Sequence, residues 1–120
     1  MADDTTILDA EQIVMLRELD AGDGTFLPTI ADEYERGANT QIDMMGQALA
    51  ADDAHTLQRA AHGLKGASAN LGAAAMTELC RALETAGREG SLDVADLLIE
   101  AIRLELERVH GALRQVVVGV

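Results

Sequence analysis

Apolar residues recur every three or four positions through most of this chain, and this helical period restricts the possible folds more than any other feature. Near the middle of the chain, Leu57, Leu64 and Leu71 are seven positions apart, with Ala61 and Ser68 between them. At about 100° per residue, these five positions form one stripe along a helix. No segment shows the two-residue alternation that is typical of a half-buried strand. The pattern therefore predicts an all-α protein.

Three similar stripes predict the other long helices. Their members are Ile42, Met45 and Leu49; Met76, Leu79, Cys80 and Leu83; and Leu98, Ile102, Leu106, Val109, Leu113 and Val116. Long amphipathic helices joined by short turns form an antiparallel bundle. We expect a four-helix bundle with core helices at about 36–51, 53–70, 73–88 and 93–117.

The N-terminal third is predicted to contain one or two short helices that cover one end of the bundle. The first follows Asp9, which with Gln12 three residues on fits a capping box. The second begins near Thr25 and ends in a kink or break at Gly37. Residues 1–8 are expected to be a loose lead-in, and the 120 residues to form one domain.

The helix ends carry recognisable capping residues. Asp52 and Asp53 are suited to ending one helix and capping the next. Glycine commonly follows the last residue of a helix. The other predicted end residues are Gly72, Gly87 and Gly90 at C-termini and Ser91 or Asp93 at an N-terminus.

Composition and charge exclude several classes of function. Hydrophobic residues make up 48% of the chain, aromatic residues 2%, and the net charge is −12. Such acidity argues against a nucleic-acid or anionic-membrane partner. No apolar run approaches the ~18 residues of a membrane span, and the acidic N-terminus lacks a signal-peptide pattern. Cys80 is the only cysteine, which excludes an internal disulfide framework and suits a cytoplasmic location.

His62 stands out on the outward face of the central helix. It lies roughly 140° from the centre of the leucine stripe, so it should point to solvent. Gly66 and Ala69 beside it are small, whereas exposed helix faces usually carry long charged residues. Lys65, three residues on, is the only lysine of the chain and can reach the imidazole. An ordinary exposed histidine is the alternative interpretation.

The run from His62 to Ala73, HGLKGASANLGA, resembles the signature of the histidine-containing phosphotransfer (Hpt) domain family. That signature is His-x-Leu-Lys-Gly, two small residues, then an aliphatic residue and Gly. The resemblance implies a helical bundle in which Nε2 of His62 accepts a phosphoryl group. It also implies two-component partners: receiver domains, which carry the Mg²⁺ site, and a sensor or hybrid histidine kinase. No cofactor of its own is expected for this chain.

The resemblance also implies roles for three other residues. Lys65 would neutralise part of the phosphoryl charge, and Gly66 would let the partner approach closely. Family members often place Gln or Glu on the next helix to orient the histidine, and the matching residue is Glu84. A carboxylate there could accept a hydrogen bond from Nδ1 and fix the tautomer. A solvated surface acid is the alternative for Glu84.

Partner-binding residues are predicted less directly. His55 and Arg59 add positive potential near His62, or they belong to a solvated face. Ala69 leaves space for a partner. Apolar docking contacts are expected from Leu16, Leu19 and Phe26, for which a place in the core is the alternative.

Three other interpretations were compared with phosphoryl transfer. An ATP-dependent kinase is unsupported, because the chain has no Gly-rich phosphate loop and no acidic triad for Mg²⁺. A shared metal site at His55 and His62 is disfavoured, since seven helical residues separate them by about 10.5 Å. A bundle that docks a receiver domain or kinase without being phosphorylated remains the main alternative.

Overall fold

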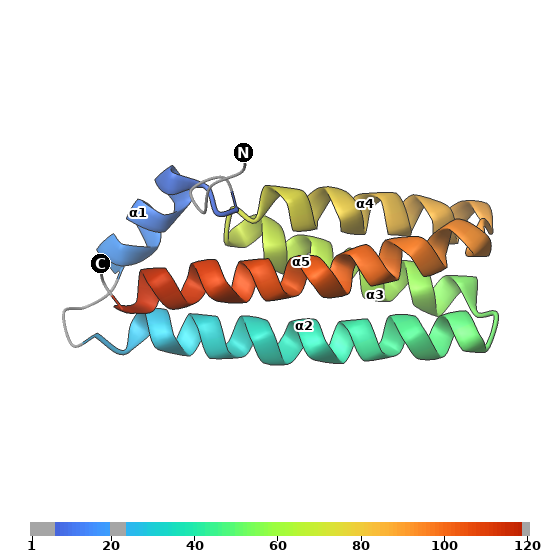
Figure 1. Ribbon diagram of the computed structural model, residues 1–120, viewed down its shortest axis with the longest axis horizontal. Coiled ribbons are helices and arrows are strands. Elements are labelled where there is room, and N and C mark those ends of the chain that lie inside the picture. Colours follow the sequence, from blue (N-terminus) through green and yellow to red (C-terminus); the bar gives the residue numbers. More distant parts are fainter. Residues whose placement is uncertain (1–6, 20–23, 119–120) are drawn as a thin grey trace.

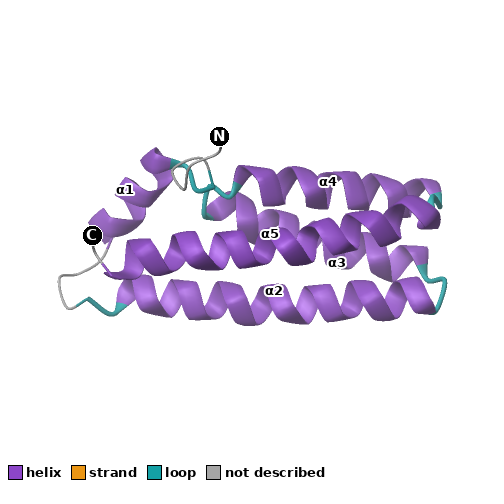
Figure 2. Ribbon diagram, in the orientation of Figure 1, coloured by secondary structure: helices purple, strands orange, loops and turns teal. Residues whose placement is uncertain are grey.

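The computed structural model describes residues 7–19 and 24–118, which fold into an antiparallel helical bundle. The helices are α1 (Ala10–Leu19), α2 (Phe26–Ala50), α3 (Ala54–Asn70), α4 (Ala74–Glu89) and α5 (Leu92–Val118). The four long helices run alternately in opposite directions, and α1 lies across one end of the bundle (Figure 1). Each long helix packs on the next, and α5 closes the ring against α2. The described residues contain no strand (Figure 2), so the predicted all-α bundle is confirmed.

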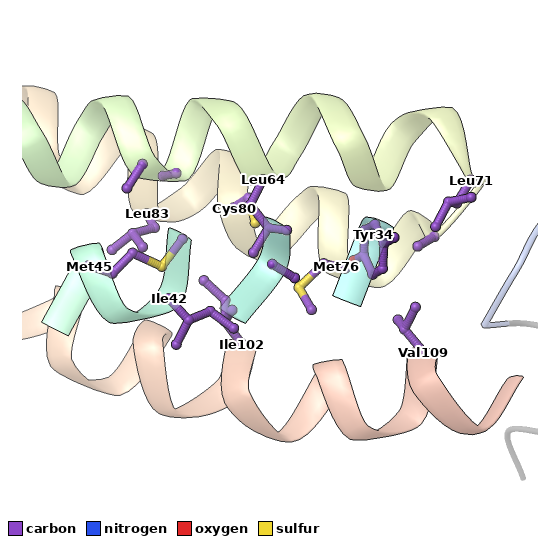
Figure 3. Packing of buried hydrophobic residues seen from close by; sticks show 14 of the residues in the cluster. Tyr34, Ile42, Met45, Leu64, Leu71, Met76, Cys80, Leu83, Ile102 and Val109 are labelled. Atoms are coloured by element: carbon purple, nitrogen blue, oxygen red, sulfur yellow. The ribbon is translucent and has the colours of Figure 1, made fainter. Parts of the chain in front are cut away.

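The leucine stripe of α3 forms one wall of the core, as predicted. Leu57, Ala61, Leu64, Ser68 and Leu71 are all buried. Side chains from the other three long helices meet them in the interior (Figure 3). Those labelled in the figure include Ile42 and Met45 on α2, Met76 and Leu83 on α4, and Ile102 and Val109 on α5. Close packing of such side chains is the main stabilising contribution in a small helical bundle.

A buried polar contact joins α2 and α3 within this core. The hydroxyl groups of Tyr34 on α2 and Ser68 on α3 are 2.8 Å apart and form a buried hydrogen bond. Burial raises the pKa of Tyr34 to about 12, so the phenol stays neutral at physiological pH. The pair satisfies two polar groups that would otherwise be costly to bury.

Asp53, Gly72 and Gly90 lie at the helix ends for which they were predicted. Asp53 is the N-cap of α3, and its carboxylate accepts hydrogen bonds from the backbone N–H and hydroxyl of Thr56 at 3.1 and 2.6 Å. Gly72 follows the end of α3 with φ of +72°, and Gly90 follows α4 with φ of +74°. These left-handed conformations favour glycine.

The predicted break at Gly37 is wrong. Helix α2 runs without interruption from Phe26 to Ala50, so the expected second short helix and the helix at 36–51 are one element. A glycine costs about 1 kcal/mol relative to alanine inside a helix. Packing along 25 residues outweighs that local cost.

Three other local predictions are corrected. Ile7 and Leu8 are buried in the core cluster rather than part of a loose lead-in; residues 1–6 of that segment lie outside the described residues. Gln12 does not complete a capping box, because its amide donates to the carbonyl of Asn70 at 2.6 Å. Gly87 does not end α4 but lies buried inside it, where an added Cβ would come within 3.2 Å of α3 backbone and side-chain atoms.

Contacts with the α3–α4 turn hold α1 at the end of the bundle. The backbone N–H of Asp9 donates to the carbonyl of Gly72 at 2.8 Å. A Cβ added to Gly72 would lie 2.6 Å from the Cβ of Asp9, whereas one added to Gly90 would meet nothing within 4 Å. Of these two glycines, only Gly72 therefore combines a left-handed conformation with a close approach.

Alanine substitution at these two glycines should separate strain from crowding. Gly90→Ala should lower the free energy of unfolding by about 1 kcal/mol, through the left-handed backbone alone. Gly72→Ala should cost about 2–3 kcal/mol, because the added methyl also displaces Asp9. Urea unfolding of both variants measures the difference, and equal losses would contradict the role of Gly72 in holding α1.

Candidate functional site

His62 lies on the outward face of α3, opposite the buried leucine stripe. Its side chain is 69% exposed, while Ala61 before it and Leu64 after it are buried. The helical period therefore places the ring in solvent and its neighbours in the core. This is the position that the sequence pattern predicted.

A carboxylate from the neighbouring helix holds one nitrogen of that ring. Nδ1 of His62 lies 2.9 Å from Oε2 of Glu84 on α4. The other oxygen of Glu84 accepts a hydrogen bond from Nζ of Lys65 at 2.6 Å. Glu84 is buried because it lies next to Leu83 on the edge of α4 that packs on α3. One carboxylate thus joins both polar residues of the predicted motif.

The ionised carboxylate determines which nitrogen of the ring carries the proton. The hydrogen bond from Lys65, followed by that from His62, lowers the pKa of Glu84 from its usual value despite burial. The carboxylate is therefore ionised at neutral pH and can only accept hydrogen bonds. Nδ1 of His62 must carry the proton in this contact, which leaves the lone pair of the neutral ring on Nε2.

The two glycines beside His62 serve different purposes. A Cβ added to Gly66 would meet nothing within 4 Å, so this residue keeps the outer surface open. A Cβ added to Gly63 would lie 2.9 Å from Nε2 of Gln41, so Gly63 lets the side chain of α2 pack against α3. Gln41 was not identified from the sequence, because nothing in the linear pattern shows which α2 residue meets Gly63.

Comparison with known proteins places the chain in a family. The family model for the Hpt domain matches residues 29–112, which include the histidine, the lysine and the carboxylate described above. The chain belongs to the Hpt domain family. A crystal structure of histidine-containing phosphotransfer protein B (HptB) from Pseudomonas aeruginosa PAO1 is similar, with a TM-score of 0.83 and 30% sequence identity. The match covers 91% of this chain and 92% of that one. Among curated proteins, none matches this chain.

The other predicted residues on α3 of this Hpt domain share the face of His62. His55, Arg59 and Ala69 are exposed, one or two turns away along the helix. His55 and Arg59 therefore lie open to solvent, and their contribution to the potential near His62 stays a prediction. The structure does not give either residue an ion-pair partner among the described residues.

The predicted docking residues at the N-terminal end are not gathered around His62. Leu16 is half-buried and packs against the core, and Phe26 is half-buried at the first residue of α2. Leu19 is exposed on α1. Because α1 is attached at Asn70, eight residues beyond His62, this end lies about 12 Å along the α3 axis from the ring. A docked domain would have to span that distance to reach Leu19.

A second histidine–carboxylate pair occurs on another face. His110 on α5 contacts Glu35 on α2 through Nδ1, and its side chain is 44% exposed. The two residues line a hollow of about 400 Å³ together with Asn39, Leu106 and Glu107. No lysine takes part in this pair, and the carboxylate of Glu107 lines the same hollow. This pair could not be predicted from the linear pattern, since its two members are 75 positions apart.

The cysteine and the possible metal ligands were also compared among the described residues. Burial raises the pKa of Cys80 to about 12, so the thiol is not a nucleophile at neutral pH. No group of three or more metal-ligating side chains occurs in the part of the chain that the structure describes. None of the described helices is long and apolar enough to cross a membrane.

Proposed function

We propose that this Hpt protein is a phosphorelay intermediate that carries a phosphoryl group on Nε2 of His62. The observation that supports this most directly is the contact of Nδ1 with Glu84, which leaves the lone pair of Nε2 facing solvent. The Hpt family membership and the similarity to HptB support the same function. We further propose that the group arrives from one receiver-domain aspartate and leaves to another.

The transfer needs no group from this chain beyond those in the site. The Nε2 lone pair attacks the phosphorus of a phosphoaspartate, the P–O bond breaks, and the aspartate leaves as a carboxylate. The product ring keeps its Nδ1 proton and becomes a cation beside the Glu84 carboxylate. In the reverse step, an aspartate oxygen attacks phosphorus and the P–N electrons return to Nε2. Such reactions depend mainly on alignment and charge neutralisation.

The proposed partners are receiver domains and a sensor or hybrid histidine kinase. The receiver would supply the Mg²⁺ that its own chemistry requires, and this chain would supply the nucleophile and Lys65. Gly66 leaves room for the receiver surface to approach the ring. No cofactor is proposed for this chain.

The test is transfer from receiver domains of the host carrying radiolabelled phosphoaspartate. We expect label on this protein within minutes, labile to acid and stable to alkali as a phosphohistidine is. A receiver that binds the protein without labelling it would favour the alternative, a docking module that is not phosphorylated. Alkali-labile label would contradict a phosphohistidine.

Lys65→Ala should slow phosphoryl transfer by about tenfold or more without unfolding the bundle, because a positive charge next to the reacting phosphoryl group is lost. Lys65 is not part of the hydrophobic core cluster, so its removal leaves the core intact. Arg81→Ala is the matched control, since it removes one positive charge from a surface pair with Glu78 on α4. Single-turnover transfer rates measure the effect, and equal rates in the two variants would remove Lys65 from the mechanism.

A further inference from the structure

Helix α5 carries a second row of apolar side chains that faces solvent. Leu97 and Leu104 are 73% and 64% exposed, the highest values among the large apolar residues of the described chain, and Val94 is 46% exposed. With the partly exposed Ala101 they occupy positions 94, 97, 101 and 104. We call these four residues the outer seam.

The spacing of the outer seam is that of a helix–helix contact. Intervals of three, four and three residues are the a and d positions of a heptad repeat. The row extends about 15 Å along the helix at 1.5 Å per residue. The core side of α5 is formed by other residues, among them Ala95, Ile102 and Val109, which are fully buried. Helix α5 is therefore apolar on two faces, and the bundle covers only one of them.

An acidic row borders the outer seam. Asp93, Glu100 and Glu107 are exposed and seven residues apart; the first two each directly precede a seam residue, and Glu107 lies three residues after Leu104. These are the g positions, which contact the flank of a partner helix in a coiled coil. A partner that packs on the seam would therefore meet three carboxylates along one side.

This charge pattern indicates which kind of partner can bind the outer seam. A second copy of the chain would bring the same acidic row to the contact, and each copy has a net charge of −12. Like charges at flanking positions oppose pairing. We propose that the outer seam binds an amphipathic helix of another protein, with apolar a and d residues and Lys or Arg along its flank.

The position of the seam leaves the phosphotransfer site open. Helix α5 packs against α2 and α4, and it lies diagonally across the bundle from α3, which carries His62 (Figure 1). A helix bound to the seam and a domain docked on His62 would occupy different sides. The seam would then hold the protein on a partner without engaging the histidine.

The test uses the whole protein and a fluorescent three-heptad peptide with Leu at a and d and Lys at e and g. Repulsion between its lysines keeps this peptide from pairing with itself. The same peptide with Glu at e and g is its control. Fluorescence anisotropy should show that the Lys peptide binds at least about tenfold more tightly than the Glu peptide.

Two pairs of variants locate the binding surface. Leu97→Gln with Leu104→Gln should weaken binding of the Lys peptide by about tenfold or more. Met15→Gln with Leu19→Gln is the matched control, because it removes two side chains of similar exposure from α1 and should leave binding unchanged. Glu100→Lys with Glu107→Lys should reverse the preference so that the Glu peptide binds more tightly. Thermal unfolding of each variant checks that the bundle is intact.

Several results would contradict this proposal, and each has a different meaning. Equal binding of the two peptides, no binding of the Lys peptide, or equal loss in the α1 variant would overturn the proposal. Sedimentation that shows a wild-type dimer, and a monomer for Leu97→Gln with Leu104→Gln, would assign the seam to a second copy instead. None of these measurements depends on phosphoryl transfer, so they stand apart from the test of the proposed function.

Discussion

His62→Gln should abolish phosphoryl acceptance, lowering the transfer rate by more than about 10³-fold. Glutamine fits the exposed site, and its amide can still donate to Glu84, so the bundle should stay folded. It has no nitrogen lone pair that can attack phosphorus, and the nucleophile is the one group that this reaction cannot replace. The measurement is single-turnover transfer from a labelled receiver domain, with circular dichroism to confirm the helical content.

His110→Gln is the matched control for this substitution. Both histidines are exposed on helices, and both place Nδ1 against a carboxylate of a neighbouring helix. His110 lacks a lysine in its ion pair and lies beside Glu107. If the local arrangement at His62 is what matters, His110→Gln should transfer at the wild-type rate. Label that persists in His62→Gln, or disappears in His110→Gln, would contradict the assignment of the site.

The bundle could be predicted from the sequence because each core stripe repeats with the helical period over several turns. The stripe from Leu57 to Leu71 set both the length of α3 and the direction of His62. Single residues were less informative. Gly37 and Gly87 suggest helix ends by their local preference, but packing against neighbouring helices keeps both inside continuous helices. Ile7 and Leu8 are too short a segment to show a period, and only the fold shows that they are buried.

The site was predictable to the extent that its residues lie on one helix. His62, Lys65 and Gly66 share α3, so their arrangement follows from spacing alone. The contact with Glu84 crosses to α4 and came from the family resemblance rather than from the pattern. The outer seam was not predicted at all. The predicted stripe of α5 includes Ile102, which is buried, but only the packing of the bundle shows that Leu97 and Leu104 form a second apolar row that faces solvent.

Glu84→Gln should slow phosphoryl acceptance by about tenfold. The wild-type carboxylate accepts hydrogen bonds from His62 and Lys65 at the same time. A neutral amide has a single acceptor oxygen, and its NH₂ group would face one of the two donors. It also cannot offset the positive charge that the ring acquires when the phosphoryl group is bound. Onward transfer should slow as well, because the hydrogen bond that holds the departing imidazole in place is weakened.

The stability of the folded protein should depend on the same contact, and this contribution should be lost in acid. Because hydrogen bonds from Lys65 and His62 depress the pKa of Glu84 in the folded state, the carboxylate stabilises the protein above its unfolded pKa. That contribution disappears as the pH falls through the lower folded value. The melting temperature of Glu84→Gln should be below that of the wild type at pH 7, and the difference should shrink in acid.

Glu78→Gln separates this specific role from the loss of one negative charge. Glu78 also lies on α4 and forms an ion pair, with Arg81 at 2.7 Å, but its side chain is 68% exposed and it does not contact His62. Surface pairs of this kind contribute little to stability. The variant should retain the wild-type transfer rate and the wild-type dependence of the melting temperature on pH. If Glu84→Gln behaved in the same way, the carboxylate would be a structural partner of Lys65 and the tautomer of His62 would be set by solvent alone.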